Sequence, residues 1–437
     1  MSIKVKDRSW THRGARLRGV KSLTSRLGFR FIIFAALVTI YHCLDLHIRY
    51  RNSMRAKYSA TQFTKNTGYY EADLSRPSWE TGRQSEPLER VILLENKKNW
   101  KRLGGGREGE VFIYNNSVIK VYDEESSPFR NCMQSISGNP KRWPTEIPAS
   151  LIMGGHDESL SALNDDSQKD MFVPVKDYFL AASGSLQSPK WHLVTPFYKE
   201  GTLSKLAKKL RTSDNPPSYH EIDMMFRPSF ESLLSALDHL HQTHNLCHDD
   251  IKMDNIFVAS EHDPRRWKVG DLGNAREPEH PYHFTPLWTA DTPQLRDCRA
   301  NDALRLVKSY LKFVRIASGN PEDFDVAFFQ GVEPVSRLYW TMALDKSFIL
   351  AEDARQLSRA FPPLRDDDSA WWAGMDSVKV KAAHSGVNAL ITALVGWNVS
   401  LGRAVTEELR VGAKEVLGQM LGLTGIMGVP ISPCQTV

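Results

Sequence analysis

One short segment of the chain contains the residue types that phosphoryl transfer requires. Asp250, Lys252 and Asn255 lie in the run HDDIKMDN, residues 248–255. A carboxylate can accept a hydroxyl proton, an ammonium group can stabilise the charge of the moving phosphoryl group, and an amide oxygen can bind magnesium. This spacing rarely occurs by chance between a helix and an apolar strand. The segment therefore predicts a catalytic loop.

A further acid follows at the end of a short predicted strand. Residues 267–273 indicate a strand that leads into Asp271 and a turn glycine, Gly273. An acid at a strand end is positioned to hold a metal ion. Asp271 and Asn255 are therefore candidate ligands of Mg²⁺.

A glycine cluster lies upstream of these acids. Gly104, Gly106 and Gly109 open the first of two alternating apolar segments, which an Asn-Asn turn joins into a predicted β-hairpin. Without Cβ atoms the backbone can fold closely over phosphates and direct its N–H groups at their oxygens. The glycine pattern alone is a weak signal. A second strand carrying Lys120, instead of a helix after the glycines, favours a clamp over ATP.

Helices must position the catalytic loop and complete the body. A helical period over 226–241 leads into the loop, and its apolar stripe is most simply interpreted as part of the hydrophobic core. Further helical periods suit a helical lobe, and they occur at Leu304–Ile316, Arg337–Leu344, Ala351–Leu357 and Ala404–Leu421. Residues 377–400 fit no element.

In this order, and over residues 96–305, the motifs resemble those of the eukaryotic protein kinase family, with the catalytic loop in its Ser/Thr form. The resemblance implies an α+β, bilobal protein-kinase-like fold. Its small β-rich N-lobe would span residues 96–198, and its larger helical C-lobe with a C-terminal extension would span 199–437. It also implies ATP and Mg²⁺ as cofactors and a protein as substrate.

The resemblance assigns a role to each matching residue. Asp250 and Lys252 would be catalytic, Asn255 and Asp271 would bind Mg²⁺, and the ATP site would comprise Gly104, Gly106, Gly109, Val111, Lys120, Thr195, Phe197 and Tyr198. Structural support would come from Glu146, His248, Gly273 and Asp302. Glu146 is the chosen partner of Lys120, and Glu124 and Glu125 are the alternatives.

The chain also departs from the family pattern. Asp249 replaces the arginine that pairs with a phosphate on the activation segment, so activation by that phosphorylation is not expected. Residues 285–292 contain no glutamate where the family has Ala-Pro-Glu. An insertion at about 154–170, rich in Ser, Asp and Gly, is expected to be a disordered surface loop.

Three functions are compatible with these motifs. The leading hypothesis is an ATP- and Mg²⁺-dependent Ser/Thr protein kinase. The second is an ATP-binding pseudokinase that acts as a scaffold or regulator, suggested by Asp249 and the missing glutamate. A small-molecule kinase ranks lowest, because such enzymes usually lack an intact glycine hairpin.

The net charge of +5 arises in a basic arm, residues 1–30. These residues carry nine Lys or Arg and one Asp, a local charge of +8, so the other 407 residues sum to −3. The body therefore lacks the basic footprint of nucleic-acid binders, and no nucleic-acid partner is expected.

Residues 31–48 form a mainly apolar segment after the arm, diluted by one Asp and two His. A bilayer span needs about 20 apolar residues. Three interpretations remain: a single-pass signal-anchor helix, an Arg-rich mitochondrial presequence, and a peripheral or buried segment. If the segment spans, the more basic arm stays cytoplasmic and the body crosses. Residues 49–95 are predicted to be a polar linker.

Five scattered cysteines indicate neither a disulfide framework nor a zinc site. Because lumenal domains often use disulfides, this argues against a lumenal body. Two formal N-glycosylation sequons, at Asn115 and Asn398, offer a test of topology.

Overall fold

The computed structural model describes residues 13–63, 87–106, 108–123, 129–133, 141–155, 169–181, 188–290, 295–344, 349–364 and 401–411. The chain divides into two compact units, Met1–Ser53 and Met54–Val437. The second unit contains both the predicted catalytic loop and the glycine cluster, and it is called the body below.

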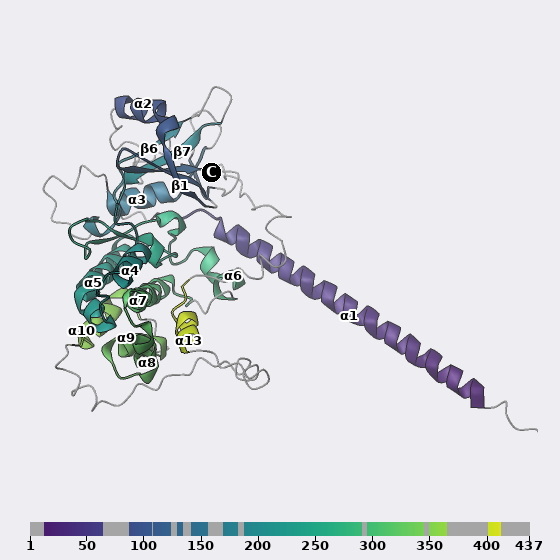
Figure 1. Ribbon diagram of the computed structural model, residues 1–437. Coiled ribbons are helices and arrows are strands. Elements are labelled where there is room, and N and C mark those ends of the chain that lie inside the picture. Colours follow the sequence, from purple (N-terminus) through teal and green to yellow (C-terminus); the bar gives the residue numbers. More distant parts are fainter. Residues whose placement is uncertain are drawn as a thin grey trace, which may run out of the picture. The chain divides into compact units, whose positions relative to one another are not determined.

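The first unit is dominated by helix α1 (Arg13–Lys57), drawn in purple in Figure 1. Its stretch from Gly28 to Lys57 is long and apolar enough to cross a membrane, and the most apolar window of that stretch is not buried. Phe31, for example, is 73% exposed. Apolar surface of this extent requires a non-aqueous environment or a partner. The predicted apolar segment 31–48 lies inside this helix.

A five-stranded antiparallel sheet forms the first lobe of the body. Its spatial order is β1-β2-β3-β7-β6. The strands are β1 (Lys101–Gly105), β2 (Gly109–Tyr114), β3 (Ser117–Tyr122), β6 (Asp177–Ala181) and β7 (Lys190–Pro196). A separate two-stranded sheet pairs β4 (Asn131–Met133) with β5 (Lys141–Trp143).

The hairpin between β2 and β3 has the predicted turn. Asn115 and Asn116 have φ values of 44° and 60°, both in the left-handed region. Asparagine tolerates this region, and a two-residue turn of this kind matches the twist of the flanking strands. The turn sets the strand register, which places Val111 opposite Lys120.

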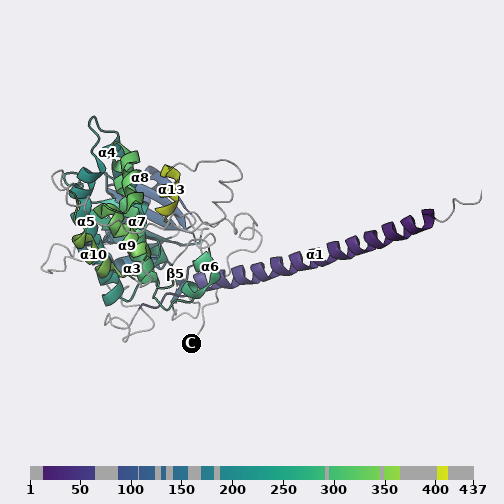
Figure 2. The same cartoon turned by 90° about the horizontal axis from the view of Figure 1, so that it is seen from below.

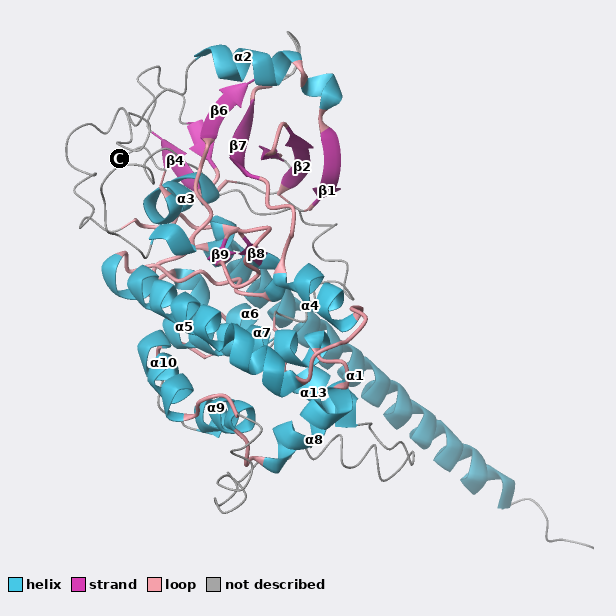
Figure 3. Cartoon of the chain, turned by 60° about the vertical axis from the view of Figure 1, so that its left-hand side comes forward, coloured by secondary structure: helices cyan, strands magenta, loops and turns pink. Residues whose placement is uncertain are grey.

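The two faces of the sheet have separate cores. On one face Trp100, Ile119 and Phe179 pack beneath the leucines of α2 (Pro87–Glu95), and the short helix η3 (Lys97–Asn99) follows α2. The main core continues from α3 (Glu146–Gly154) into the helical lobe. Figure 3 shows α2 and α3 beside the sheet at one end of the body.

The second lobe is helical. Its helices are α4 (Leu203–Arg211), α5 (Tyr219–Thr243), α6 (Pro286–Ala290), α7 (Cys298–Ala317), α8 (Pro321–Gln330), α9 (Pro334–Leu344), α10 (Ala351–Ala360) and α13 (Leu401–Glu408). A small β8 (Ile256–Val258) and β9 (Trp267–Val269) ribbon and the 3₁₀ turns η5 (Lys169–Met171), η6 (Met253–Asn255), η7 (Leu272–Asn274) and η8 (Pro281–Phe284) complete it. Figure 2 shows α5, α7 and α9 grouped in this lobe.

Helix α5 forms the centre of this lobe. Ser218 and Glu221 form a reciprocal capping box at its start, which satisfies backbone N–H groups that the first turn leaves free. Further along, Phe226 stacks on Trp267 and Phe230 stacks on Tyr310 of α7. The end of α5 is therefore held rigidly where the chain turns into the catalytic loop.

The structure confirms the predicted α+β bilobal fold and most of the predicted helices. Helices α5, α7 and α9 contain the predicted periods at 226–241, 304–316 and 337–344, and α10 contains 351–357. Residues 404–411 of the predicted helix at 404–421 are described, and they are helical as far as Glu408. Residues 377–400 and most of the insertion at 154–170 lie outside them.

The structure differs from the expected linker at 49–95. Met54, Tyr58, Thr61 and Phe63 are buried in the body, and residues 87–95 form α2. The sequence did not reveal these contacts, because the large apolar residues of 49–95 follow neither a helical nor a strand period.

Candidate functional site

The glycine cluster lies on β1, β2 and the turn between them. Gly109 has φ = 151°, and a Cβ there would lie 2.0 Å from the Val121 carbonyl oxygen, so only glycine fits. Gly104 and Gly106 have open space where a Cβ would project. The first two glycines therefore leave room over the sheet edge, whereas the third allows close strand packing.

Lys120 on β3 is the centre of a charge cluster. Its Nζ donates to Glu146 Oε2 in a very short contact, lies 2.9 Å from Glu108 Oε2, and lies 3.5 Å from Asp271 Oδ1. Tyr122 also donates to Glu146, at 2.6 Å. The carboxylates of Glu108, Glu146 and Asp271 lie within 4.8 Å of one another. They form a set of oxygens that could hold a cation.

Burial and charge shift the pKa values of this cluster. Burial raises the pKa of Glu146 to about 6, although the Lys120 charge opposes the shift. Burial alone would lower the pKa of Lys120, but the surrounding carboxylates and Tyr122 raise it well above its usual value. Lys120 therefore stays protonated at neutral pH. Of the predicted partners, Glu146 makes the contact, while Glu124 and Glu125 lie outside the described residues.

Glu146 is the first residue of α3. Pro148 occupies the third position, where its missing N–H removes no helical hydrogen bond. Proline and the helix start therefore bring the carboxylate to the end of α3 that faces Lys120. Glu146 thus lies inside α3, and Thr145 precedes the helix.

The catalytic loop is compact and internally bonded. Lys252 Nζ lies 2.6 Å from Asp250 Oδ2. The Asn255 amide donates to the Asp250 carbonyl at 2.9 Å and to its carboxylate at 3.2 Å. Asn255 is buried, whereas the Asp250 and Lys252 side chains are 22% and 40% exposed. The loop thus presents a carboxylate and an ammonium group to the surface.

Asp302 of α7 supports this loop from below. Its carboxylate accepts the backbone N–H groups of His248 and Asp249, at 2.6 and 3.0 Å, and it is fully buried. The His248 ring contacts the Gly270 carbonyl at 3.1 Å, and the Gly270 N–H donates to the Asn255 carbonyl. These bonds join the catalytic loop to Gly270, which lies between β9 and Asp271.

Asp271 has an unusual backbone conformation. Its φ and ψ are 61° and 58°, in the left-handed region. A non-glycine residue there costs about 1–2 kcal/mol, and such strain clusters at functional sites. The next glycine, Gly273, would meet the Glu108 carboxylate at 3.1 Å if it carried a Cβ, and its carbonyl accepts from Arg130.

The strand β7 and the residues after it connect the two lobes. Thr195 pairs with Val118 of β3 and is half-buried. The Phe197 N–H donates to the Asn116 carbonyl at 3.2 Å, and the Tyr198 ring lies 6.1 Å from Phe257 of β8. The predicted adenine-binding segment therefore lies beside the β2–β3 turn, whereas Gly109 pairs with Tyr122 at the other end of β3.

A second charge cluster surrounds Asp249. Its Oδ2 accepts from Arg276 Nη1 at 3.1 Å and from His283 Nε2 at 2.8 Å, and Arg305 donates to its carbonyl. Although burial opposes ionisation, the charges of His283 and Arg276 lower the pKa of Asp249. Arg276 and His283 both belong to residues 271–290, which follow β9 and are called the activation segment below after the predicted kinase resemblance. The residue that replaces the family's arginine therefore binds cations of the activation segment directly.

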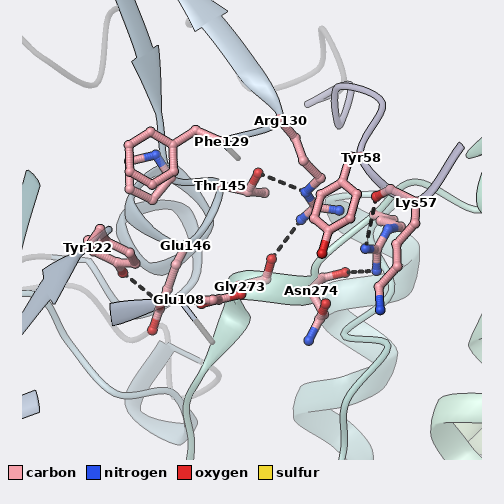
Figure 4. A pocket seen from close by; sticks show the side chains of 12 residues that line it. Lys57, Tyr58, Glu108, Tyr122, Phe129, Arg130, Thr145, Glu146, Gly273 and Asn274 are labelled. Carbon is pink, nitrogen blue, oxygen red and sulfur yellow. Dashed lines mark hydrogen bonds between the residues drawn. The ribbon is translucent and has the colours of Figure 1, made fainter. Parts of the chain in front are cut away.

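Residues 54–63, called the strap below, also contact the activation segment. Thr61 Oγ1 donates to the Ala275 carbonyl at 3.0 Å, and the Gln62 N–H donates to Glu277 at 3.0 Å. Arg276 donates to the Lys57 carbonyl. Lys57 and Tyr58 of the strap line a cavity of about 300 Å³ that Glu146 also lines, shown in Figure 4.

Two groups of residues were missed by the sequence argument. Glu108 lies inside the glycine pattern, but nothing in that pattern marks its contact with Lys120. Cys247 and Cys298 form a disulfide, so the expectation of no disulfide is wrong. Their separation of 51 residues left no local pattern to indicate the pair.

Comparisons with known proteins give distant similarities. No protein-family model matches the sequence. "Probable serine/threonine-protein kinase samkB" of Dictyostelium discoideum is 31% identical over 75 residues, which are 17% of this chain and 12% of that protein. The BubR1 kinase domain crystal structure aligns with TM-score 0.37 and 15% identity, over 62% of this chain and 81% of that chain. The chain has a distant, protein-kinase-like relationship.

Proposed function

We propose that this protein-kinase-like chain transfers the γ-phosphoryl group of ATP to Ser or Thr hydroxyls of a protein. The observation that carries the proposal is the position of Lys120, which contacts both Glu146 and Asp271. An ammonium group held between a helix carboxylate and the acid after β9 has the geometry needed to fix the phosphates of a bound nucleotide.

The donor set fits ATP and Mg²⁺. Gly104 and Gly106 leave open space beside the sheet edge, where backbone N–H groups could approach phosphate oxygens. Asp271 and Asn255 supply the carboxylate and amide oxygens that magnesium prefers. Lys120 would hold the nucleotide phosphates, and Thr195, Phe197, Tyr198 and Val111 would line the adenine side.

The catalytic loop supplies the groups that act on the substrate. When bound, ATP would supply the phosphoryl group and Mg²⁺ would neutralise its charge. Asp250 would orient the substrate hydroxyl and accept its proton as the hydroxyl oxygen bonds to phosphorus and the bond to the β–γ bridging oxygen breaks, releasing ADP. Lys252, 2.6 Å from Asp250, would stabilise the charge on the transferred group.

Phosphate transfer by the full chain tests the proposal. We expect purified protein in detergent micelles with Mg-ATP to phosphorylate itself or generic acidic and basic protein substrates. Asp250→Asn should reduce the rate by at least about 100-fold, because it removes the proton acceptor. Asp254→Asn is the matched control, since Asp254 is exposed in the same loop. No transfer by the wild type, or equal rates for both variants, would contradict the proposal.

A pseudokinase that binds ATP without turnover is the second candidate. The contact between Glu108 and Lys120 favours it, because a carboxylate there competes with phosphates for the same ammonium group. Thermal unfolding with Mg-ATP separates the two candidates. A Tm that rises with Mg-ATP, and no longer rises in Lys120→Ala, shows ATP binding. Such binding without transfer would support the scaffold.

We further propose that α1 anchors the chain in a membrane as a single span. The exposed apolar surface from Gly28 onward supports this proposal. Mitochondrial targeting is the alternative, since the preceding arm is rich in Arg. Carbonate extraction of cell membranes tests the anchor, because an integral span resists extraction and a peripheral segment does not.

A further inference from the structure

The disulfide between Cys247 and Cys298 lies directly against the catalytic machinery. Cys247 precedes His248 of the catalytic loop, and Cys298 begins α7, the helix that carries Asp302. Asp302 and the disulfide therefore tie the loop to the same helix, one by hydrogen bonds and one by a covalent bond. Both cysteines are 0% exposed.

The burial of this disulfide indicates a structural role. Redox-sensing cysteines must be accessible to the thiols that oxidise and reduce them. A disulfide without accessible surface cannot exchange readily in the folded protein, so it has to form while the chain folds. Disulfides of this kind form and persist in oxidising compartments and are rare in the cytosol.

The charges on the two sides of the apolar segment also indicate that the body lies outside the cytosol. Residues 1–30 have a net charge of +8. After the apolar segment, the end of α1 carries only Arg49, Arg51, Arg55 and Lys57. Because the more basic flank of a span remains in the cytosol, the body would be translocated.

The sequon at Asn115 is placed where a glycan could be attached. Asn115 lies at the tip of the β2–β3 hairpin and is exposed, and Ser117 completes the sequon at the start of β3. N-glycosylation requires such an accessible Asn-x-Ser site in a translocated protein. The second sequon, at Asn398, lies outside the described residues.

From these three observations we infer that the body lies on the lumenal or extracellular side of a secretory-pathway membrane and carries an N-glycan at Asn115. The disulfide that joins its catalytic loop to α7 would form and persist in such an oxidising compartment. The substrates are therefore hydroxyl-bearing proteins of the secretory pathway or cell surface. This last clause rests on the proposed kinase function, whereas the topology and the modification site do not.

Protease protection of the full chain, expressed in eukaryotic cells, tests the topology. In sealed microsomes we expect the body to resist added protease until detergent opens the membrane. Removal of N-glycans should shift the wild-type band on a gel. Asn115→Gln should lose one glycan step, whereas Asn116→Gln should keep it, because Asn-Gln-Ser remains a sequon.

Thiol counting tests the disulfide in the same cells. Denatured lysate is treated with a mass-tagged maleimide before and after reduction, for wild type and for a Cys247→Ser/Cys298→Ser double variant. Wild type should show no more reactive thiols than the double variant before reduction, and two more afterwards. The assay works on denatured protein, so misfolding of the variant does not affect it.

Each opposite result overturns a stated part of the inference. Two additional reactive thiols before reduction, or digestion of the body in sealed microsomes, would overturn the topology. A disulfide and a protected body without any glycan step at Asn115 would overturn the modification site, and cofractionation with mitochondria would overturn the secretory compartment. None of these readouts requires phosphate transfer, so failure of the kinase proposal remains distinguishable.

Discussion

The two charge clusters of the body have opposite composition. Around Lys120, one cation meets three carboxylates, those of Glu108, Glu146 and Asp271, and the Asp271 side chain is 38% exposed. Around Asp249, one carboxylate meets the side chains of Arg276 and His283, and its own side chain is 1% exposed. The cluster around Lys120, called the open cluster below, carries excess negative charge at an accessible edge. The cluster around Asp249, called the closed cluster below, is shielded from solvent.

This difference indicates two separate tasks. An accessible excess of carboxylate can be balanced by a ligand, such as a metal ion that accompanies a nucleotide. A buried carboxylate must be balanced by the protein itself, because an unpaired buried charge is very costly. We therefore expect the Asp249 cluster to hold the activation segment without a phosphate, and the Lys120 cluster to respond to a ligand.

The largest expected effect comes from breaking the closed cluster. Asp249→Asn leaves Arg276 buried without its carboxylate, which should destabilise the protein by about 3–5 kcal/mol. Thermal unfolding of the full chain in detergent should show this as a large drop in Tm. Asp254→Asn, an identical change at an exposed position of the same loop, should change Tm little. Equal Tm values for the two variants would show that the Asp249 cluster is not structural.

The strap is the second support of the activation segment. Thr61→Val keeps the shape of a side chain that is 3% exposed but removes its hydrogen bond to the Ala275 carbonyl. We expect a loss of about 0.5–1.5 kcal/mol and faster proteolysis of the activation segment. We also expect a lower kcat with little change in KM for ATP, because the Thr61 hydroxyl bonds the activation segment at Ala275 and not a residue of the proposed ATP site.

Thr212→Val is the matched control for the strap. Thr212 also donates to a backbone carbonyl, but it is exposed at the end of α4. If both variants lowered kcat equally, or if Thr61→Val changed only the KM for ATP, the strap would not position the activation segment.

The open cluster was largely predictable and the closed one was not. Of the residues around Lys120, the sequence named Lys120, Glu146 and Asp271 and missed Glu108. Asp250, Lys252 and Asn255 of the catalytic loop were found because their spacing is local, and a loop keeps such residues together whatever the remainder of the fold does. The sequence also predicted the lobes, because hydrophobic period and the Asn-Asn turn are local signals. These signals do not depend on contacts between distant residues.

The contacts that hold the activation segment join residues far apart in the chain. Thr61 and the Ala275 carbonyl are 214 residues apart, and Cys247 and Cys298 are 51 apart. No periodicity or motif marks either pair, so polar residues 49–63 resembled a linker. Asp249 was recognised as a departure from the family pattern, but its partners became visible only when tertiary structure placed Arg276 beside it.

A smaller effect tests whether the open cluster responds to a ligand. Glu108→Gln removes the carboxylate 2.9 Å from Lys120, which would otherwise compete with nucleotide phosphates. We expect Mg-ATP to bind about 3- to 10-fold more tightly, or about 1 kcal/mol, as measured by titration calorimetry. Glu110→Gln is the control, because Glu110 pairs with Arg102 at an exposed position. Weaker Mg-ATP binding by Glu108→Gln would instead indicate that Glu108 is a metal ligand.

The smallest effect is a pH dependence of the closed cluster. Burial opposes protonation of His283, but the Asp249 charge outweighs it and raises the His283 pKa above its usual 6.5. Because the pKa is higher in the folded state, the stabilisation is complete below about pH 6.5. The stabilisation is lost as pH rises through the folded-state pKa.

The Tm of the wild type should therefore fall as pH rises from about 6.5 through the folded-state pKa of His283. His283→Gln should lack that part of the dependence of Tm on pH. His280→Gln should keep it and should show a steeper fall, because burial lowers the pKa of His280 and wild-type folding therefore expels its proton at low pH. Identical slopes in His283→Gln and wild type would mean that His283 is uncharged and that Arg276 alone balances Asp249.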